Sequence, residues 1–186
     1  MNSPQQSGYL EIILGSMYSG KTSRLIEIYK QCTFCNISVA VINHSIDDRY
    51  DEELLSTHDH VKIPCIKTER LFNVLESNKF QLARSSVILI NEGQFFPDLE
   101  EFVKKLLQHN KKVYVCGLDG DFERKKFGQI LYLIPLCDKV TKLTSLCGMC
   151  KNGTLGIFSK RISCEQMQTV VGTDNYIPVC RSCYDR

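Results

Sequence analysis

Residues 15–22 read Gly-Ser-Met-Tyr-Ser-Gly-Lys-Thr and fit the pattern G-x-x-x-x-G-K-[ST]. The glycines let the backbone curl, so that its N–H groups converge on phosphate oxygens. Lys21 can reach the β- and γ-phosphates of a nucleotide, and the Thr22 hydroxyl can bind Mg²⁺. The pattern therefore predicts a phosphate-binding loop. Its candidate nucleotide-binding residues are Gly15, Ser16, Met17, Tyr18, Ser19, Gly20, Lys21 and Thr22.

The sequence on both sides of this loop favours the same interpretation. Residues 9–14 are an apolar stretch of strand length, and residues 22–35 carry an apolar stripe at helical spacing. A strand followed by a glycine-rich loop and a helix is the context that a phosphate-binding loop requires. A glycine-rich turn without a ligand is the alternative, and this context makes it the weaker one.

Apolar strand-like stretches and helical patterns alternate along most of the chain. This alternation predicts an α/β fold with a mostly parallel sheet and helices on both faces, of the P-loop NTPase-like (RecA-like) kind. Residues 44–59 interrupt it as a long polar loop without a visible core stripe. Strands are expected at 9–14, 38–43, 86–91, 112–118 and, as a fifth candidate, 139–146; helices are expected at 22–35, 70–80 and from 97 onward.

Acidic and polar residues follow the apolar stretch at 87–90. P-loop enzymes place an acidic residue at the end of a neighbouring strand, close to Mg²⁺. Glu92 is therefore a candidate base that accepts or orients a proton of the acceptor hydroxyl. The alternative is a solvated or helix-capping glutamate, which an isolated position would favour. Asn91, Gly93 and Gln94 are candidate nucleotide-binding residues of the same turn.

Ten cysteines are many for a chain without an export signal, and metal binding explains some of them better than disulfides do. Cys147/Cys150 and Cys180/Cys183 form two C-x-x-C pairs with 29 residues between them. Four thiolates can enclose a structural Zn²⁺ ion tetrahedrally. We therefore expect a zinc-binding domain at 147–186 and an ATP-binding α/β domain at 1–146.

The remaining cysteines are not assigned to the metal. A third pair, Cys32 and Cys35, begins on the apolar stripe of the first helix, so burial in the core is the favoured role. Cys116 lies inside an apolar strand and is expected to be a small core residue.

Composition excludes several classes of protein. The chain has 186 residues and a formal net charge of +2, too weak to indicate nucleic acid or an anionic membrane as a main partner. Residues 1–8 carry no apolar signal segment, and no apolar run approaches the roughly 20 residues of a membrane helix. We therefore expect a soluble, intracellular protein.

Several motifs in order resemble those of the type II thymidine kinases of cells and large DNA viruses. The resemblance extends from about Tyr9 to Tyr184. Besides the phosphate loop and the paired cysteines, it rests on D-D-R-Y at 47–50, T-H-D at 57–59, N-E-G-Q-F-F-P-D at 91–98, L-D-G-D-F at 118–122, K-L-T at 142–144 and F-S-K-R at 158–161.

The resemblance implies an enzyme that transfers the γ-phosphate of ATP to the 5′-hydroxyl of thymidine. Glu92 then matches the catalytic base of the family, and Arg49 matches the arginine that stabilises the phosphates. Asp47 matches a residue near the hydration shell of Mg²⁺, and Asp48 is its neighbour in the nucleotide-binding motif. The polar loop at 44–59 becomes an expected lid.

The resemblance also implies a thymidine pocket. Met17, Leu118, Phe122 and Phe127 would surround the base, although Phe122 and Phe127 taken alone would be read as core aromatics. A loop before the last cysteine pair would cover the base largely through its backbone. Its candidate residues are Met167, Gln168, Thr169, Val170, Val171 and Tyr176.

Further expectations follow from the family alone: a homotetramer, feedback inhibition by thymidine triphosphate, and residence in the cytoplasm, the host's if the source is viral. The absence of the long regulatory tail of animal members fits a viral or bacterial source. Three departures are visible. Asn91 replaces an aspartate, Val171 replaces a common glycine, and the 150–158 stretch is longer, which leaves the role of Ser159 open.

A second class of protein fits part of the sequence. A P-loop ATPase module with a nucleic-acid-binding zinc ribbon would also combine the phosphate loop, the acidic strand end and the paired cysteines. The short chain and the nearly balanced charge disfavour this alternative.

Overall fold

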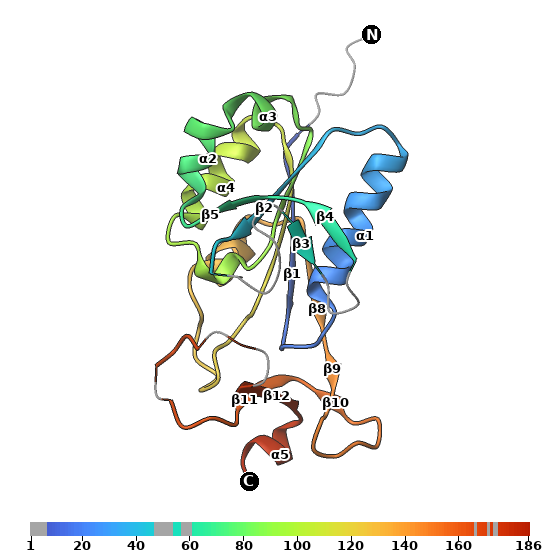
Figure 1. The fold of residues 1–186 in the computed structure, drawn as a ribbon, viewed down its shortest axis with the longest axis vertical. Helices are drawn as coiled ribbons and strands as arrows, with labels where there is room; N and C mark the ends of the chain where they lie inside the picture. Colours follow the sequence, from blue (N-terminus) through green and yellow to red (C-terminus); the bar gives the residue numbers. More distant parts are fainter. Residues whose placement is uncertain (1–6, 47–53, 57–60, 166, 171, 173–174) are drawn as a thin grey trace.

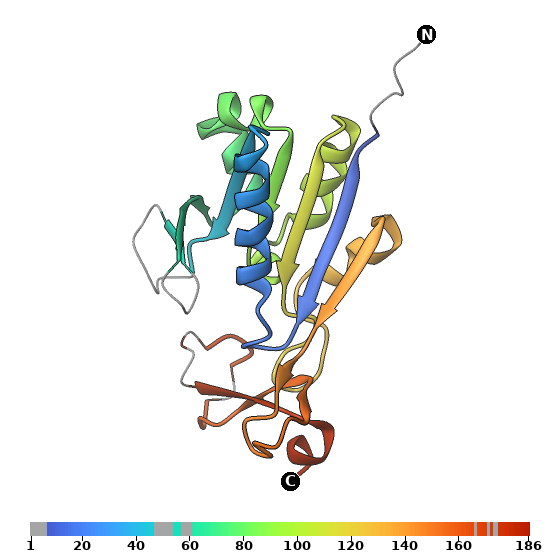
Figure 2. The same cartoon turned by 90° about the vertical axis from the view of Figure 1, so that its right-hand side faces the viewer.

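A computed structural model describes residues 7–46, 54–56, 61–165, 167–170, 172 and 175–186. Its centre is a six-stranded sheet in the order β5-β2-β6-β7-β1-β8. Neighbouring strands of this sheet all pair in parallel, as Figure 2 shows for the long strands. The expected α/β class with a mostly parallel sheet is confirmed.

The elements of the first half follow the expected alternation closely. They are β1 (Tyr9–Gly15), α1 (Lys21–Phe34), β2 (Val39–His44), β3 (Leu54–Ser56), β4 (Lys62–Pro64), β5 (Ile66–Thr68), α2 (Leu71–Ser77), α3 (Lys79–Arg84) and β6 (Val87–Ile90).

The second half adds a short helical turn and several small strands. Its elements are η1 (Gly93–Phe95), α4 (Leu99–Gln108), β7 (Lys112–Gly117), η2 (Ile130–Leu136), β8 (Lys139–Leu143), β9 (Ser145–Leu146), β10 (Leu155–Gly156), β11 (Phe158–Arg161), β12 (Tyr176–Val179) and α5 (Arg181–Tyr184).

Helices cover both faces of the sheet. Successive side chains of a strand point to opposite faces, and β1 follows this rule: Leu10 and Ile12 belong to the core layer of α2 and α4, whereas Ile13 belongs to the layer of α1. Figure 1 shows α1 on one side of the sheet and α2, α3 and α4 on the other. Both layers are apolar, which explains why the strands read as nearly continuous apolar runs.

Three sequence predictions differ from the structure. The helix expected at 70–80 breaks at Asn78 into α2 and α3. The segment expected as a long loop at 44–59, without a visible core stripe, contains the strand β3, and Leu55 of this strand is fully buried. Only Lys139–Leu143 of the fifth candidate strand joins the main sheet, because Ser145–Leu146 pairs with β10 instead.

The C-terminal segment forms a small unit beside the end of β1 where the phosphate loop begins (Figures 1 and 2). Two antiparallel pairs, β9 with β10 and β11 with β12, build it together with α5. A domain boundary at residue 146 stays a prediction. Across the described ranges, no helix is both long and apolar enough to cross a bilayer.

Candidate active site

The sheet order brings three distant segments of the chain together. Strands β6, β7 and β1 are neighbours, and each is followed at its carboxyl end by residues that the sequence singled out. Parallel α/β sheets bind ligands at this edge. The phosphate loop after β1, the turn at 91–94 after β6 and the segment from Leu118 after β7 therefore lie on one side of the molecule.

The loop between β1 and α1 has the curled backbone that its sequence predicts. Gly20 caps α1 in the left-handed region with φ 84°, and Tyr18 also has a positive φ, 61°. The Lys21 ammonium donates to the Ser16 carbonyl at 2.8 Å, across the curve of the loop. The loop thus surrounds a cationic group at the N-terminal end of a helix, which is a favourable environment for phosphate.

The C-terminal unit holds this loop in place. The Met17 N–H donates to Ser159 Oγ at 2.9 Å, and the Ser16 hydroxyl donates to the Gly156 carbonyl at 2.9 Å. Ser145 donates to the same carbonyl at 3.0 Å. The structure therefore assigns Ser159 a contact with the phosphate loop despite the longer stretch before it.

Glu92 has an uncommon backbone conformation for a residue with a side chain. Its φ is 54° and its ψ 42°, in the left-handed region. Outliers of this kind cost of order 1–3 kcal/mol and persist mainly at functional sites. The Gln94 amide donates to Glu92 Oε2 at 2.6 Å and accepts from the Leu118 N–H at 3.0 Å. Gln94 therefore fixes both the carboxylate and the start of the 118–127 segment.

Glycines make room for Gln94. A Cβ at Gly117 would lie 2.3 Å from Gln94 Oε1, and a Cβ at Gly128 would lie 1.9 Å from the Gln94 carbonyl oxygen. Gly128 also has a left-handed φ of 60°. Both positions consequently require glycine, and Gln94 is 3% exposed between them.

Asn91 lies behind this turn and does not line the pocket. It is 1% exposed; its Nδ2 donates to Asn43 Oδ1 at 2.9 Å, and its Oδ1 accepts from the Cys116 thiol at 2.9 Å. Burial raises the pKa of Cys116 to about 12, so the thiol keeps its proton. The three side chains form a buried polar link between β2, β6 and β7.

One pocket contains most of the predicted site. Glu92, Gln94 and several residues of the phosphate loop line it, together with predicted base-contacting residues from the later segments. The predicted residues in its wall are Met17, Tyr18, Ser19, Gly20, Lys21, Thr22, Glu92, Gln94, Leu118, Phe122, Phe127, Gln168, Thr169, Val170 and Tyr176.

Other predicted residues lie elsewhere. Gly15, Ser16 and Gly93 lie behind the pocket wall as Asn91 does, and Met167 is 70% exposed outside it. Asp47, Asp48, Arg49 and Val171 lie outside the described residues, so their expected roles stay predictions.

Sequence reasoning missed several residues of the wall, among them Phe95, Gly120 and Asp121. Asp121 is 6% exposed and accepts from the N–H groups of Glu123 and Lys125, both at 2.9 Å. The aspartate and glycine of L-D-G-D-F were the available signal, because they indicate a tight turn. Phe95 packs edge-on against Phe127, with ring centroids 5.3 Å apart.

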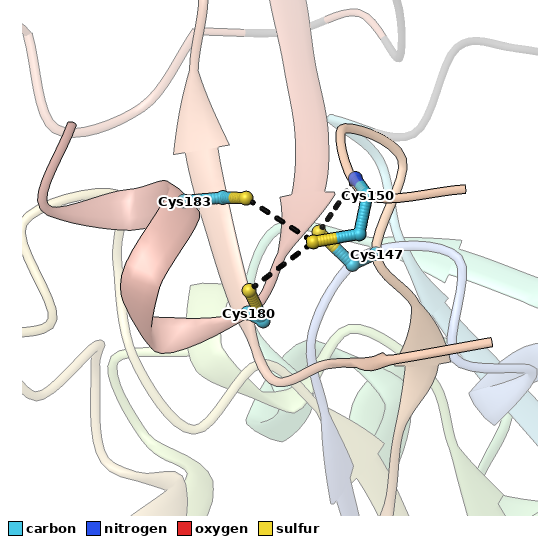
Figure 3. Close-up of side chains that lie close together, drawn as sticks. All are labelled: Cys147, Cys150, Cys180 and Cys183. Carbon is cyan, nitrogen blue, oxygen red and sulfur yellow. Dashed lines mark hydrogen bonds between the residues drawn. The ribbon is translucent and has the colours of Figure 1, made fainter. Parts of the chain in front are cut away.

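Four cysteines from the two ends of the C-terminal unit converge, as expected. The sulfurs of Cys147, Cys150, Cys180 and Cys183 all lie within 4.8 Å of one another (Figure 3). Cys150 Sγ is 3.4 Å from Cys183 Sγ and 3.8 Å from Cys180 Sγ. A tetrahedral zinc site with Zn–S bonds of about 2.3 Å has sulfurs about 3.8 Å apart. The cluster therefore fits Zn²⁺.

The backbone favours the thiolate form of Cys147, whereas hydrogen bonding to the Cys150 sulfur raises the pKa of Cys183 to about 12. The Cys150 N–H donates to Cys147 Sγ at 3.4 Å. This hydrogen bond contributes most to lowering the pKa of Cys147, which falls to about 6. Metal binding requires the thiolate form, and the surrounding core is small, consisting mainly of the cysteines with Val179, Phe158 and Ile177. A bound ion would therefore contribute much of this unit's stability.

A phosphate loop and a polar–aromatic pocket at the carboxyl edge of a parallel sheet define a nucleotide-binding α/β protein. Comparison with known proteins identifies the family of the chain. Residues 8–184 match the protein family described as thymidine kinase, and the chain belongs to this family.

Individual relatives agree over nearly the whole chain. The chain is 43% identical to the thymidine kinase of Yaba monkey tumor virus, over 99% of this chain and 97% of that one. It is 40% identical to the thymidine kinase of Vaccinia virus (strain Ankara), over 95% and 97% of the two chains. Thymidine kinase 1 of Dictyostelium discoideum is 39% identical over 97% of this chain and 79% of its own length.

Proposed function

We propose that the chain transfers the γ-phosphate of ATP to the 5′-hydroxyl of thymidine, giving thymidine monophosphate. The observation that carries the proposal is a pocket whose wall contains residues of the phosphate loop, Glu92 and residues of the aromatic 118–127 segment together. Family membership supports the same reaction. Phosphoryl transfer depends mostly on positioning and charge stabilisation, which is what these residues offer.

Each part of the pocket has its own role in the proposed reaction. Backbone N–H groups of the phosphate loop and the Lys21 ammonium hold the triphosphate. Thr22 would contribute its hydroxyl to Mg²⁺, which neutralises developing charge on the phosphates when bound. Glu92, kept in place by Gln94, accepts the proton of the attacking hydroxyl. Leu118, Phe122, Phe127 and Tyr176 enclose the thymine base.

A substrate panel tests the proposal. ATP consumption is measured with each of the four deoxynucleosides and with single-stranded DNA. We expect thymidine to give the fastest turnover and a nucleoside monophosphate as product. ATP hydrolysis stimulated by DNA and by no nucleoside would overturn the proposal in favour of an ATPase module.

We also propose that the four-cysteine cluster binds a zinc ion with a purely structural role. With four thiolates and no open coordination position, the ion would take no part in the phosphoryl transfer. Its place is to close the C-terminal unit, which holds the phosphate loop through Ser159 and Gly156.

Other properties are supported by the family resemblance alone. These are a homotetrameric assembly, feedback inhibition by thymidine triphosphate, nucleotide binding by Asp47, Asp48 and Arg49, and cytoplasmic residence. The absence of a nucleic acid partner is inferred instead from the weak net charge of +2. Size-exclusion chromatography with light scattering and inhibition assays test the first two directly.

Replacing Gln94 by Met is expected to lower kcat about ten- to hundredfold, because a hydrogen bond to a charged group contributes about 1.5–3 kcal/mol. Met has a similar length but cannot donate to Glu92 or accept from Leu118. Steady-state kinetics with purified protein measure the effect. Gln129→Met is the matched control, because Gln129 likewise joins two groups, Pro97 O and the Glu100 N–H, outside the pocket. Equal losses in both variants would contradict a specific role for Gln94.

Replacing Asn91 by Asp tests whether this position senses Mg²⁺. We expect the free Mg²⁺ needed for half-maximal activity to fall on the order of tenfold or less, since a negative charge attracts the ion even from behind the pocket wall. The Asn43 amide has to turn over to donate to the new carboxylate, so thermal unfolding is measured alongside. An unchanged Mg²⁺ titration in a folded variant would show that residue 91 is too deeply buried to influence the metal.

A further inference from the structure

The loop that leads to Tyr176 is organised by one side chain that lies outside the pocket wall. Arg161, the last residue of β11, donates from Nη1 to the Glu165 carbonyl at 3.0 Å and from Nη2 to the Gln168 carbonyl at 3.0 Å. It also donates from Nη1 to the Met167 carbonyl. Three backbone acceptors of the loop are thereby held by one planar group.

The same guanidinium joins two aromatic walls of the pocket. Its central carbon is 3.7 Å from the centre of the Phe122 ring and 5.0 Å from that of Tyr176. Nη2 also donates to the Tyr176 hydroxyl, which in turn donates to the Val170 carbonyl at 3.3 Å. Phe122, Val170 and Tyr176 all line the pocket, whereas Arg161 does not.

A second connection ties this loop to the segment after β7. Gln168 Nε2 donates to Asp121 Oδ2 at 2.7 Å, while Asp121 Oδ1 holds the following turn. The loop therefore meets the 118–127 segment at two places, Arg161 over Phe122 and Gln168 on Asp121. Neither contact involves the phosphate loop.

We propose that Arg161 is a positioning residue for the nucleoside: it fixes the three loop carbonyls, Phe122 and Tyr176 in the arrangement that receives the base. The inference rests on the proposed function. The loss of Arg161 should affect only one of the two substrates, because the ATP phosphates bind to a different segment of the chain. Nucleoside affinity depends on Arg161, and ATP affinity does not.

The geometry of the guanidinium makes the role specific to arginine. A guanidinium presents five N–H donors in one plane and stacks on aromatic rings, whereas the lysine ammonium is a compact point charge. Lysine at this position keeps the charge but cannot reach three carbonyls and a hydroxyl together while lying flat on Phe122. Arg161→Lys therefore removes the organisation and leaves the charge.

Kinetics and hydrogen exchange of Arg161→Lys test the proposal. We expect the KM for thymidine to rise about ten- to hundredfold, because several charge-assisted bonds are lost, with the KM for ATP within about twofold of wild type. Amide exchange in peptides covering 165–170 should accelerate. Arg84→Lys is the matched control, since Arg84 lies over Phe80 on α3, away from the pocket. Arg84→Lys should change neither the KM for thymidine nor the amide exchange of residues 165–170.

A chemical rescue and a milder variant complete the test. Added ethylguanidinium should restore part of the thymidine affinity of Arg161→Ala and none of that of Arg161→Lys, whose side chain occupies the space. Tyr176→Phe, which keeps the ring and removes only the hydroxyl between Arg161 and the Val170 carbonyl, should raise the KM for thymidine less than Arg161→Lys does. It serves as the kinetic test if the Arg161 variants do not fold.

The outcomes separate this inference from the proposed function. An unchanged KM for thymidine, or equal increases in the KM values for thymidine and ATP, would overturn the role of Arg161. If the wild-type chain phosphorylates no deoxynucleoside, the proposed function fails. Hydrogen exchange without substrate then still decides whether Arg161 fixes the loop, and unchanged exchange in Arg161→Lys would contradict it.

Discussion

Glu92→Gln is expected to lower kcat by about 10²–10⁴-fold, the usual contribution of a general base. Glutamine preserves the size of the side chain, but its amide cannot accept the proton of the nucleoside hydroxyl. The phosphate loop is held by contacts to Ser159 and Gly156, which this substitution leaves in place. The KM for ATP should therefore remain close to that of the wild type.

The measurement combines steady-state kinetics with nucleotide binding by calorimetry. Glu123→Gln is the matched control, because Glu123 is an exposed glutamate that forms an ion pair with Lys125 in the 118–127 segment. Its kcat should change little, as exposed ion pairs contribute little. Near-wild-type turnover of Glu92→Gln would remove Glu92 from the mechanism, and loss of ATP binding would show that it acts on the nucleotide instead.

Cys180→Ser is expected to abolish metal binding and to loosen the whole C-terminal unit. The purified wild type should hold about one zinc ion per chain, because four thiolates make one closed site, and the variant close to none. Structural zinc contributes about 10–16 kcal/mol in zinc-finger peptides, so the expected loss of order is large. Elemental analysis and thermal unfolding measure both effects.

The pocket should respond to this loss. Tyr184, next to Cys183, donates its hydroxyl to the Phe122 carbonyl, and its ring lies under Arg124 with 4.2 Å between the guanidinium carbon and the ring centre. The KM for thymidine is expected to rise in Cys180→Ser. Cys35→Ser is the control, because Cys35 is exposed at the end of α1. A metal-free wild type, or a zinc-free variant with unchanged thymidine affinity, would contradict this account.

The sequence was sufficient where local pattern determines structure. The strand, loop and helix at 9–35 follow from apolar periodicity and two glycines, and the two cysteine pairs from their spacing. Leu55 was missed because two adjacent leucines, Leu54 and Leu55, in a polar stretch show neither a helical nor a strand period. Its burial depends on the core layer that it shares with α1.

The candidate site was predictable in its parts and not in its connections. Phe122 and Phe127 could not be told from core aromatics by spacing, and only the family resemblance placed them in a pocket. The bonds of Arg161 to three loop carbonyls, and of Ser159 to the phosphate loop, join residues that no local pattern links. For Asn91, the sequence predicted the position at a strand end but not the contacts. Its amide is hydrogen-bonded to Asn43 and Cys116 inside the protein.

The order of the strands has a consequence for how the chain folds. β1 precedes the other described strands along the chain, yet its neighbours in the sheet are β7 and β8, with Tyr9 opposite Lys112 and Glu11 opposite Lys139. Closing such long loops is entropically costly and makes parallel sheets slow to form. β2 can pair with β6 earlier, since Val39 meets Val87. The phosphate loop follows β1 directly in the chain and is therefore among the last parts of the sheet to acquire its final surroundings.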